Sequence, residues 1–117
     1  MFDFARTAKY TQILLQNPGE VAAIIANLQK HGIYVSALEL MQMGWRDSLK
    51  YLIEQFKARY KDKFDAVIES EMSIILRAMQ LIKQYGYDDF TPRNIIETLH
   101  LNGVNPKPYE QAITEGF

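Results

Sequence analysis

The chain has 117 residues, no cysteine, and a net charge of −1 that results from 13 basic and 14 acidic residues. A chain of this length is expected to form one domain over residues 1–117 that buries about two thirds of the surface its unfolded form exposes, so a core without disulfides suffices. The near-neutral charge gives no overall attraction to nucleic acid or to an anionic membrane, and the absence of thiols excludes disulfides, thiolate zinc sites and a cysteine nucleophile.

The N-terminal part of the chain predicts two helices. Residues 4–16 contain neither glycine nor proline, and Asp3 is a suitable N-terminal cap, although the apolar residues of this segment are irregularly spaced. Asn17 is a favourable cap for a second helix, because Pro18 suits the first helical position and apolar residues then recur along one face as far as His31. The second of these helices is the more clearly marked.

A third, short helix is predicted between Ser36 and Gly44. Ser36 is followed three residues later by Glu39, which indicates a capping box, and Gly44 ends the helix. The residues between these limits are mostly apolar and leave little polar surface. Such a helix must be buried within the domain or covered by a partner.

The middle of the chain, residues 45–85, contains neither glycine nor proline and keeps a helical apolar period throughout. One unbroken helix of roughly 38 residues would be about 57 Å long, which exceeds the width of a domain of this size. We therefore expect a break, and residues 59–65 form the most highly charged window in which to place it. No strong helix-breaking residue enforces the break, so one long amphipathic helix is the alternative.

Two further helices are predicted after Gly86. Thr91 is a suitable cap for the first of them, and Pro92 fits its first helical position. The last short helix starts at Pro106 and ends near Gly116. Because no segment alternates apolar and polar residues as a strand does, the predicted fold is all-α, an irregular bundle of six or seven helices.

One unit occurs twice in the chain. Residues 24–39 read IIANLQKHGIYVSALE and residues 95–110 read IIETLHLNGVNPKPYE, so both fit the pattern IIxxLxxxG[I/V]xxxxxE. The glycine predicts a helix end in the left-handed conformation, after which the next residue folds back onto the side chain five positions earlier. Four glycines fit this description: Gly32, Gly44, Gly86 and Gly103. The chain is thus expected to contain two similar helix-turn-helix units.

A DNA-reading helix-turn-helix is the functional alternative for this repeat. In that case the second helix of one unit would enter the major groove. The second copy carries Pro106 and Pro108 in that helix, and few of its side chains donate hydrogen bonds to base edges. We therefore interpret the repeat as architecture.

No group of residues indicates a catalytic, cofactor-binding or metal-binding site. His31 and His100 are the only histidines, and each lies in the last turn of its predicted helix, where it interacts favourably with the helix dipole. Asp88 and Asp89 form the only adjacent acidic pair and precede a helix, where acidic side chains are stabilised. We expect a protein without enzymatic activity, metal or cofactor.

The start of the chain does not resemble a secretory signal. The segment MFDFARTAKY carries Asp3 and has no sustained apolar stretch, and the longest aliphatic run, residues 21–26, is too short to span a bilayer. We therefore expect a cytoplasmic protein without a membrane partner. Its small size and the lack of a targeting signal are also compatible with a prokaryotic or phage source.

Residues 57–63, KARYKDK, form the one basic concentration and carry a charge of +3, against −4 for the rest of the chain. Because aromatic residues are interleaved with them, they could follow phosphates and stack a base, as single-strand-binding proteins do. The aromatic residues recur every four positions, however, which favours a core face beside a solvated basic face. The candidate nucleic-acid contacts of this alternative are Lys57, Arg59, Lys61 and Lys63.

The segment LELMQMGW, residues 38–45, is the stronger candidate for contact with another protein, because methionine and tryptophan are enriched at interfaces. Tyrosines that follow the predicted helix ends could extend such a surface. The candidate interface residues are Tyr34, Leu38, Met41, Met43, Trp45 and Tyr87. A purely structural role of this segment is the competing interpretation.

Together these patterns predict a small non-enzymatic protein-binding module, such as an adaptor, an inhibitor or an assembly component. The sequence does not identify its protein partner, and a homodimer through the long middle helix is one form that the binding could take. A nucleic-acid-binding regulator that uses the basic window and one helix-turn-helix unit is the alternative function.

Overall fold

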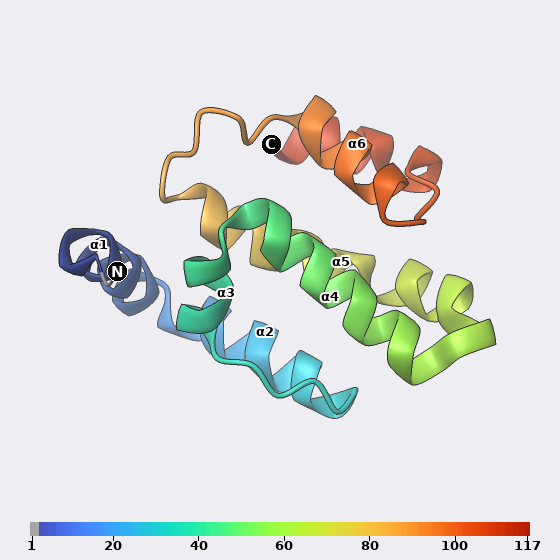
Figure 1. Ribbon diagram of the computed structural model, residues 1–117, viewed down its shortest axis with the longest axis horizontal. Coiled ribbons are helices and arrows are strands. Elements are labelled where there is room, and N and C mark those ends of the chain that lie inside the picture. The colour runs from blue at the N-terminus through green and yellow to red at the C-terminus, as the bar shows by residue number, and fades with distance from the viewer. Residues whose placement is uncertain (1–2) are drawn as a thin grey trace.

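Within residues 3–117, which the computed structural model describes, every regular element is a helix (Figure 1). The predicted all-α bundle is therefore confirmed, with seven α-helices and two 3₁₀ helices in this part of the chain. The elements are α1 (Phe4–Gln16), α2 (Pro18–Lys30), α3 (Ala37–Met43), α4 (Trp45–Tyr60), η1 (Lys61–Lys63), α5 (Phe64–Lys83), α6 (Pro92–Leu101), η2 (Lys107–Tyr109) and α7 (Glu110–Gly116).

Three of the predicted helix caps are present. The side chain of Asp3 accepts a hydrogen bond from the backbone of α1 at 3.0 Å, and that of Thr91 accepts one from the backbone of α6 at 3.2 Å. The Glu39 N–H donates to the Ser36 hydroxyl at 3.1 Å, and the Glu39 carboxylate accepts from the Ser36 N–H. These caps satisfy backbone N–H groups that have no partner within their helices.

Asn17 differs from its predicted role as a side-chain cap of α2. Its side-chain amide donates to the Ile13 carbonyl at 2.7 Å and so closes α1, while Pro18 begins α2 as predicted. The Asn17 carbonyl accepts from the Val21 N–H at 3.0 Å. A single residue separates the two helices, and it serves the end of one with its side chain and the start of the other with its backbone.

The long middle segment is broken and folds back on itself. α4 ends at Tyr60 and α5 starts at Phe64, and these two helices pack against each other more extensively than any other pair. The longest dimension of the molecule is 41 Å, which is shorter than the roughly 57 Å of an unbroken helix. The break is at Lys61, whose φ of 50° lies in the left-handed region that residues other than glycine rarely adopt.

The two copies of the repeat end their first helices with equivalent hydrogen bonds. In the first copy the Ile33 N–H donates to the Leu28 carbonyl at 3.0 Å, and in the second the Val104 N–H donates to the Leu99 carbonyl at 2.9 Å. The glycine before each donor has a positive φ and also donates to its helix. Both turns are therefore Schellman motifs, as the repeat predicts.

The other two glycines differ from this prediction. Gly44 and Gly86 also have positive φ, but among the described residues neither is followed by a backbone bond to the carbonyl five positions earlier. Gly44 donates to the Met41 carbonyl and accepts from the Ser48 N–H, so it joins α3 directly to α4. The expected fold-back is absent at Gly44 because the next helix begins immediately after it.

α4 lies between the two copies of the repeat, with α2 and α6 on opposite sides of it in Figure 1. Leu49, Leu52 and Ile53 of α4 have no exposed surface. Buried side chains from all seven α-helices form one continuous hydrophobic core. Both copies of the repeat thus contribute to the same core around one central helix.

Candidate protein interface

Two of the six residues of the predicted interface are buried. Met41 has no exposed surface and Trp45 is 2% exposed, so neither is available to a partner in this structure. Trp45 stacks on Phe90 with 4.7 Å between the ring centroids. The predicted role of Met41 and Trp45 as contact residues does not fit the structure, because α3 is covered by α1 and α4 of its own chain.

The acidic turn before α6 fixes the start of α4. Asp89 accepts a hydrogen bond from the Trp45 indole N–H at 3.0 Å, and the Arg46 guanidinium lies 2.5 Å from its other carboxylate oxygen. The bond from Trp45, followed by that from Arg46, holds the pKa of Asp89 below its ordinary value. These contacts give Asp89 a structural role at the junction of the acidic turn with α4.

The other four residues of the predicted interface do not form a single surface. Tyr34 is 76% exposed in the loop between α2 and α3, whereas Leu38, Met43 and Tyr87 are partly buried against the core. Met43 and Tyr87 line an open groove beside Trp45, and Tyr34 and Leu38 lie outside it. The surface of the segment 38–45 is therefore largely used for contacts within the chain.

The first helix supplies the cover that α3 requires. α1 packs against α3 and buries Tyr10 and Ile13. The Tyr10 hydroxyl lies 3.0 Å from the Tyr87 hydroxyl, and the Arg6 guanidinium donates to both. Burial, together with the hydrogen bond to Tyr87, raises the pKa of Tyr10 to about 12. These contacts anchor α1 to the loop that follows α5.

The opposite side of α1 faces solvent. Phe4 and Leu15 are 79% and 76% exposed, and with Ala8 and Thr11 they form a stripe at intervals of four, three and four residues. Such intervals return to the same side of a helix, so the stripe runs along its length. We call this surface the α1 outer face, and its residues are Phe4, Thr7, Ala8, Thr11, Gln12, Leu15 and Gln16.

The α1 outer face is absent from the sequence-based prediction. The apolar residues of α1 are irregularly spaced because they belong to two sides of the helix: Tyr10 and Ile13 are buried, while Phe4 and Leu15 are exposed. The signal that could have identified the face is the lack of any charged residue along the stripe from Phe4 to Leu15.

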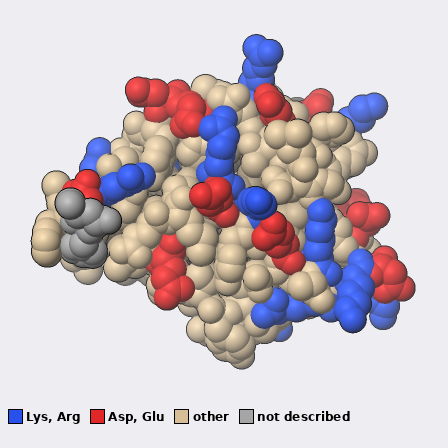
Figure 2. All heavy atoms as spheres, in the orientation of Figure 1, with Lys and Arg blue, Asp and Glu red and all other residues tan. Residues whose placement is uncertain are grey.

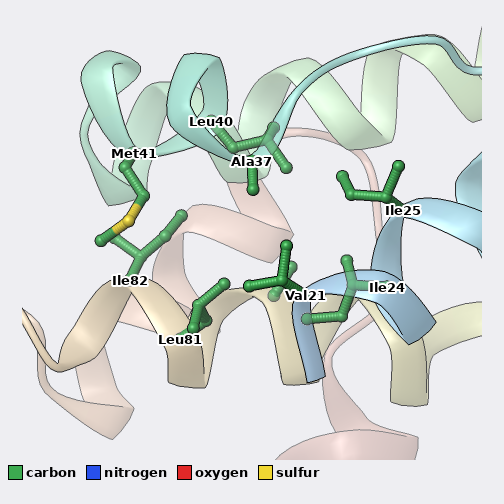
Figure 3. A pocket seen from close by; sticks show the side chains of 9 residues that line it. Val21, Ile24, Ile25, Ala37, Leu40, Met41, Leu81 and Ile82 are labelled. Atoms are coloured by element: carbon green, nitrogen blue, oxygen red, sulfur yellow. The ribbon is translucent and has the colours of Figure 1, made fainter. Parts of the chain in front are cut away.

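An apolar pocket lies between α2, α3 and α5 (Figure 3). Val21 and Ile25 of α2, Leu40 of α3 and Ile82 of α5 point into it, and every residue that lines it is apolar. Its free volume is about 10 Å³, at the lower limit for one water molecule. Because the lining offers no hydrogen bond, the pocket is a small packing defect and not a ligand site.

Two cations of the basic window cap helix ends. Lys57 donates to the Asn102 carbonyl in the turn of the second repeat copy. Arg59 donates to the Gly32 carbonyl in the turn of the first copy, with 2.6 Å from Nη2 to the oxygen. Cations that bind the last carbonyls of a helix also complement its dipole. Lys57 and Arg59 are therefore engaged within the fold.

The other two cations of the basic window are exposed. Lys61 and Lys63 lie in η1 with Asp62 between them. Figure 2 shows Lys and Arg side chains gathered at the end of the molecule where α4 meets α5, with acidic side chains beside them. This surface has mixed charge, with its basic residues concentrated around the break between the two helices.

The neighbours of His31 connect three helices. Its Nδ1 lies 2.6 Å from the Tyr60 hydroxyl and its Nε2 lies 3.4 Å from a Glu71 carboxylate oxygen, so the end of α2 contacts both α4 and α5. His31 also packs edge-on against Phe56. Nowhere in residues 3–117 do three or more potential metal-ligating side chains lie close enough together to hold a metal ion.

The described part of the chain contains no helix with both the length and the apolarity needed to cross a membrane. Comparison with protein-family models, with characterised proteins and with solved structures gives no match. The functional proposal therefore depends on the surfaces described above.

Proposed function

We propose that the protein is a small non-enzymatic binding module that acts in the cytoplasm and binds a protein partner on the α1 outer face. The proposal rests on that face itself, an uncharged helix surface with a large apolar side chain exposed at each end. Contiguous exposed apolar surface on a folded protein is a common sign of an interaction site. An adaptor, an inhibitor or an assembly component would each use such a surface.

A partner helix is the ligand that suits this surface. Helices that pack against other helices are recognised through anchors about one turn apart, at i, i+4 and i+7. The stripe of Phe4, Ala8, Thr11 and Leu15 has this spacing. Full burial of a side chain such as Phe4 or Leu15 contributes about 1.5–3 kcal/mol before the cost of association is subtracted, so we expect the contact to be weak and reversible.

Site-specific photo-cross-linking in cells of the native host tests the proposal. A photoreactive residue at Thr11 is compared with the same residue at Lys63, which is exposed in η1. We expect the Thr11 position to cross-link one defined protein that the Lys63 position does not. Cross-links from Lys63 alone would place the binding surface elsewhere and contradict the proposal.

Two leucine variants provide the matched control. Leu15 is 76% exposed on α1 and Leu101 is 72% exposed on α6, so a charge at either position perturbs a similar environment. Leu15→Asp should abolish the cross-link from Thr11, and Leu101→Asp should leave it unchanged. Equal loss in both variants would show that the cross-link does not depend on the α1 outer face.

A nucleic-acid-binding regulator is the second candidate function, favoured by the basic residues gathered where α4 meets α5 (Figure 2). It ranks second because Lys57 and Arg59 bind carbonyls of the fold, which leaves Lys61 and Lys63 for phosphates. In addition, α3, the second helix of the first repeat unit, is covered by α1 and α4.

Binding of a fluorescent single-stranded oligonucleotide separates the two functions. A nucleic-acid-binding protein would lose affinity steeply between about 50 and 200 mM salt, because phosphate contacts release counterions. The double variant Lys61→Gln/Lys63→Gln would weaken that binding further. The binding-module proposal expects no salt-dependent oligonucleotide binding and no effect of Leu15→Asp in this assay.

A further inference from the structure

We propose that the Tyr60 hydroxyl is a nucleophile that accepts an acyl group from an activated carboxylic ester, with His31 as its base and Glu71 as the group that orients His31. The inference goes beyond the proposed function, because it concerns a covalent modification site near the junction of α4 and α5 and not the α1 outer face. Tyr60 is the last residue of α4, His31 follows α2, and Glu71 belongs to α5, so the fold brings the three side chains together.

The three side chains are arranged as a nucleophile, a base and an orienting acid. The Tyr60 hydroxyl oxygen lies 2.6 Å from Nδ1 of His31, and Nε2 of the same ring lies 3.4 Å from a Glu71 carboxylate oxygen. A hydroxyl within hydrogen-bond distance of a base that a third group orients is the arrangement that activates the nucleophile of a catalytic triad. The contact with Glu71 is the longer of the two, and contacts of this kind often shorten when a substrate binds.

Glu71 determines which nitrogen of His31 acts as the base. An ionised carboxylate only accepts hydrogen bonds, so it favours the tautomer of the neutral imidazole that has its proton on Nε2. Nδ1 is then an acceptor, and we assign the Tyr60 hydroxyl as its donor. The hydroxyl proton therefore points at a base, while lone pairs of the oxygen remain available to an electrophile.

The group is partly exposed and its tyrosine ring is held in place. Tyr60 is partly buried against the core, and the side chains of His31 and Glu71 are 19% and 24% exposed. Phe56 lies nearly parallel to the Tyr60 ring, and His31 packs edge-on against it. These ring contacts fix the direction of the hydroxyl, which lowers the entropy cost of a reaction there.

The surroundings of Tyr60 also suit a reactive position. Among the described residues, Lys61, which follows Tyr60 directly, has the only positive φ outside glycine, and strained conformations of this kind cluster at functional sites. Basic side chains gather at this end of the molecule (Figure 2), and the Arg59 guanidinium binds the carbonyl of Gly32, the residue after His31. Because the carbonyl oxygen of an ester becomes negative during attack, positive charge nearby favours the reaction.

The proposed step is an acyl transfer without a change in oxidation state. The Tyr60 oxygen attacks the carbonyl carbon of the ester, a carbon–oxygen bond forms, and Nδ1 of His31 takes the hydroxyl proton. The tetrahedral intermediate then collapses, the bond to the leaving alkoxide or phenoxide breaks, and the leaving group departs as an anion or takes the proton from His31. The products are an O-acyl tyrosine and the free alcohol or phenol.

Acetylation by p-nitrophenyl acetate, followed residue by residue with peptide mass spectrometry, tests the proposal. Tyr34 is the reference in the same chain, because its side chain is 76% exposed. A positioned base accelerates such a step by about 10²-fold or more, so Tyr60 should be acetylated roughly 10²-fold faster than Tyr34 although it is less exposed. A Tyr60 rate no higher than that of Tyr34 overturns the proposal, and this comparison needs no variant.

Two glutamine variants of α5 test the role of Glu71. In Glu71→Gln the shape is kept, but the amide also donates, so the proton of His31 is no longer directed to Nε2 and the base is lost. Glu69→Gln makes the same change of charge on the same helix, at a side chain that lines the pocket beside Tyr109. Glu71→Gln should slow acetylation of Tyr60 by about tenfold or more, and Glu69→Gln should leave it unchanged. Circular dichroism checks folding, and equal rates in the two variants contradict the role of Glu71.

The pH profile of acetylation distinguishes a histidine base from ionisation of the phenol alone. An imidazole acts as a base only when it is unprotonated, and histidine changes charge between about pH 5 and 8. Besides Tyr60 and Glu71, the guanidinium of Arg59 lies beside this histidine through its bond to Gly32. Acetylation of Tyr60 should rise across this interval and then level off, whereas that of Tyr34 should keep rising. Parallel profiles for the two tyrosines overturn the assignment of His31 as the base.

Discussion

Ser48 lies near the start of α4 with no exposed surface, and its hydroxyl makes no hydrogen bond within the described residues. Thr98, the other buried serine or threonine of this part of the chain, donates from its hydroxyl to the Asn94 carbonyl at 2.7 Å. An unpaired buried polar group destabilises the native state by about 1–3 kcal/mol, whereas a paired one is close to neutral or favourable. The two side chains thus differ in whether the buried oxygen has a partner.

We expect Ser48→Ala to raise the free energy of unfolding by about 1 kcal/mol, because it removes the unpaired oxygen and alanine is a stronger helix former. Thr98→Val keeps the shape of its side chain but loses a hydrogen bond, so it should lower that free energy by about 1 kcal/mol. Urea denaturation followed by circular dichroism measures both changes. Destabilisation by Ser48→Ala would show that the Ser48 hydroxyl has a partner.

At the scale of the elements, the junction of α4 and α5 depends on an unfavourable backbone conformation. Lys61 has φ 50° and ψ −114°, and its N–H donates to the Lys57 carbonyl. Lys63, two residues later, has an ordinary φ of −92°. A conformation like that of Lys61 costs about 1–3 kcal/mol in a residue with a side chain, and the packing of α4 on α5 offsets this.

We expect Lys61→Gly to raise the free energy of unfolding by about 1 kcal/mol, since glycine adopts positive φ without strain. Lys63→Gly should lower it by about 0.5–1 kcal/mol, because there glycine only adds freedom to the unfolded chain. Both variants remove one positive charge from η1, so their difference reports the backbone. Thermal unfolding of the pair checks this, and equal shifts in both would argue against strain at Lys61.

Elements whose cause is local could be predicted from the sequence. The capping box at Ser36, the helix starts at Pro18 and Pro92, and the glycine turns of the repeat each depend on residues within one or two helical turns. The conformation of Lys61 could not be predicted from the sequence, because it results from the packing of α4 on α5 and not from the residue type. The high charge of residues 59–65 indicates where the break lies, but it does not explain why the chain turns there.

The candidate site could be predicted only in part, for the same reason. Both sides of α1 carry apolar residues, and contact between Tyr10 and Tyr87, 77 residues apart, decides which side is buried. A pattern within α1 contains no information about that contact. Likewise, Met41 and Trp45 are of residue types that are enriched at protein interfaces. In this structure both side chains are buried against other helices of the same chain.

At the scale of the whole molecule, the attachment of α1 makes stability sensitive to alkaline pH. The pKa of Tyr10 is raised from 10.0 to about 12 by burial and by its bond to Tyr87. Well below pH 10 this tyrosine is protonated in both states, and its contribution to stability is fully present. Above pH 10 the unfolded chain releases the proton while the native protein retains it until about pH 12, so unfolding becomes more favourable. Burial raises the pKa of Tyr109 in the same direction.

We expect the free energy of unfolding to fall as the pH rises from 10 to 12, with a shallower slope in Tyr10→Phe than in the unmodified chain, because phenylalanine has no proton to release. Tyr34→Phe, which removes the hydroxyl of a 76% exposed side chain, is the matched control. Urea denaturation at several pH values in this interval gives the slopes. An identical slope in Tyr10→Phe would mean that Tyr10 ionises equally easily in both states.

The two caps that α4 supplies have a consequence for how the molecule unfolds. Lys57 and Arg59 are two residues apart, which corresponds to about 200° around the helix, and each donates to the turn of a different repeat copy. A rotation of α4 about its own axis therefore withdraws both donors together. Repeats stacked in a linear array can unravel one at a time. Here the two copies share the helix that caps them, so we expect both turns to lose their side-chain caps together.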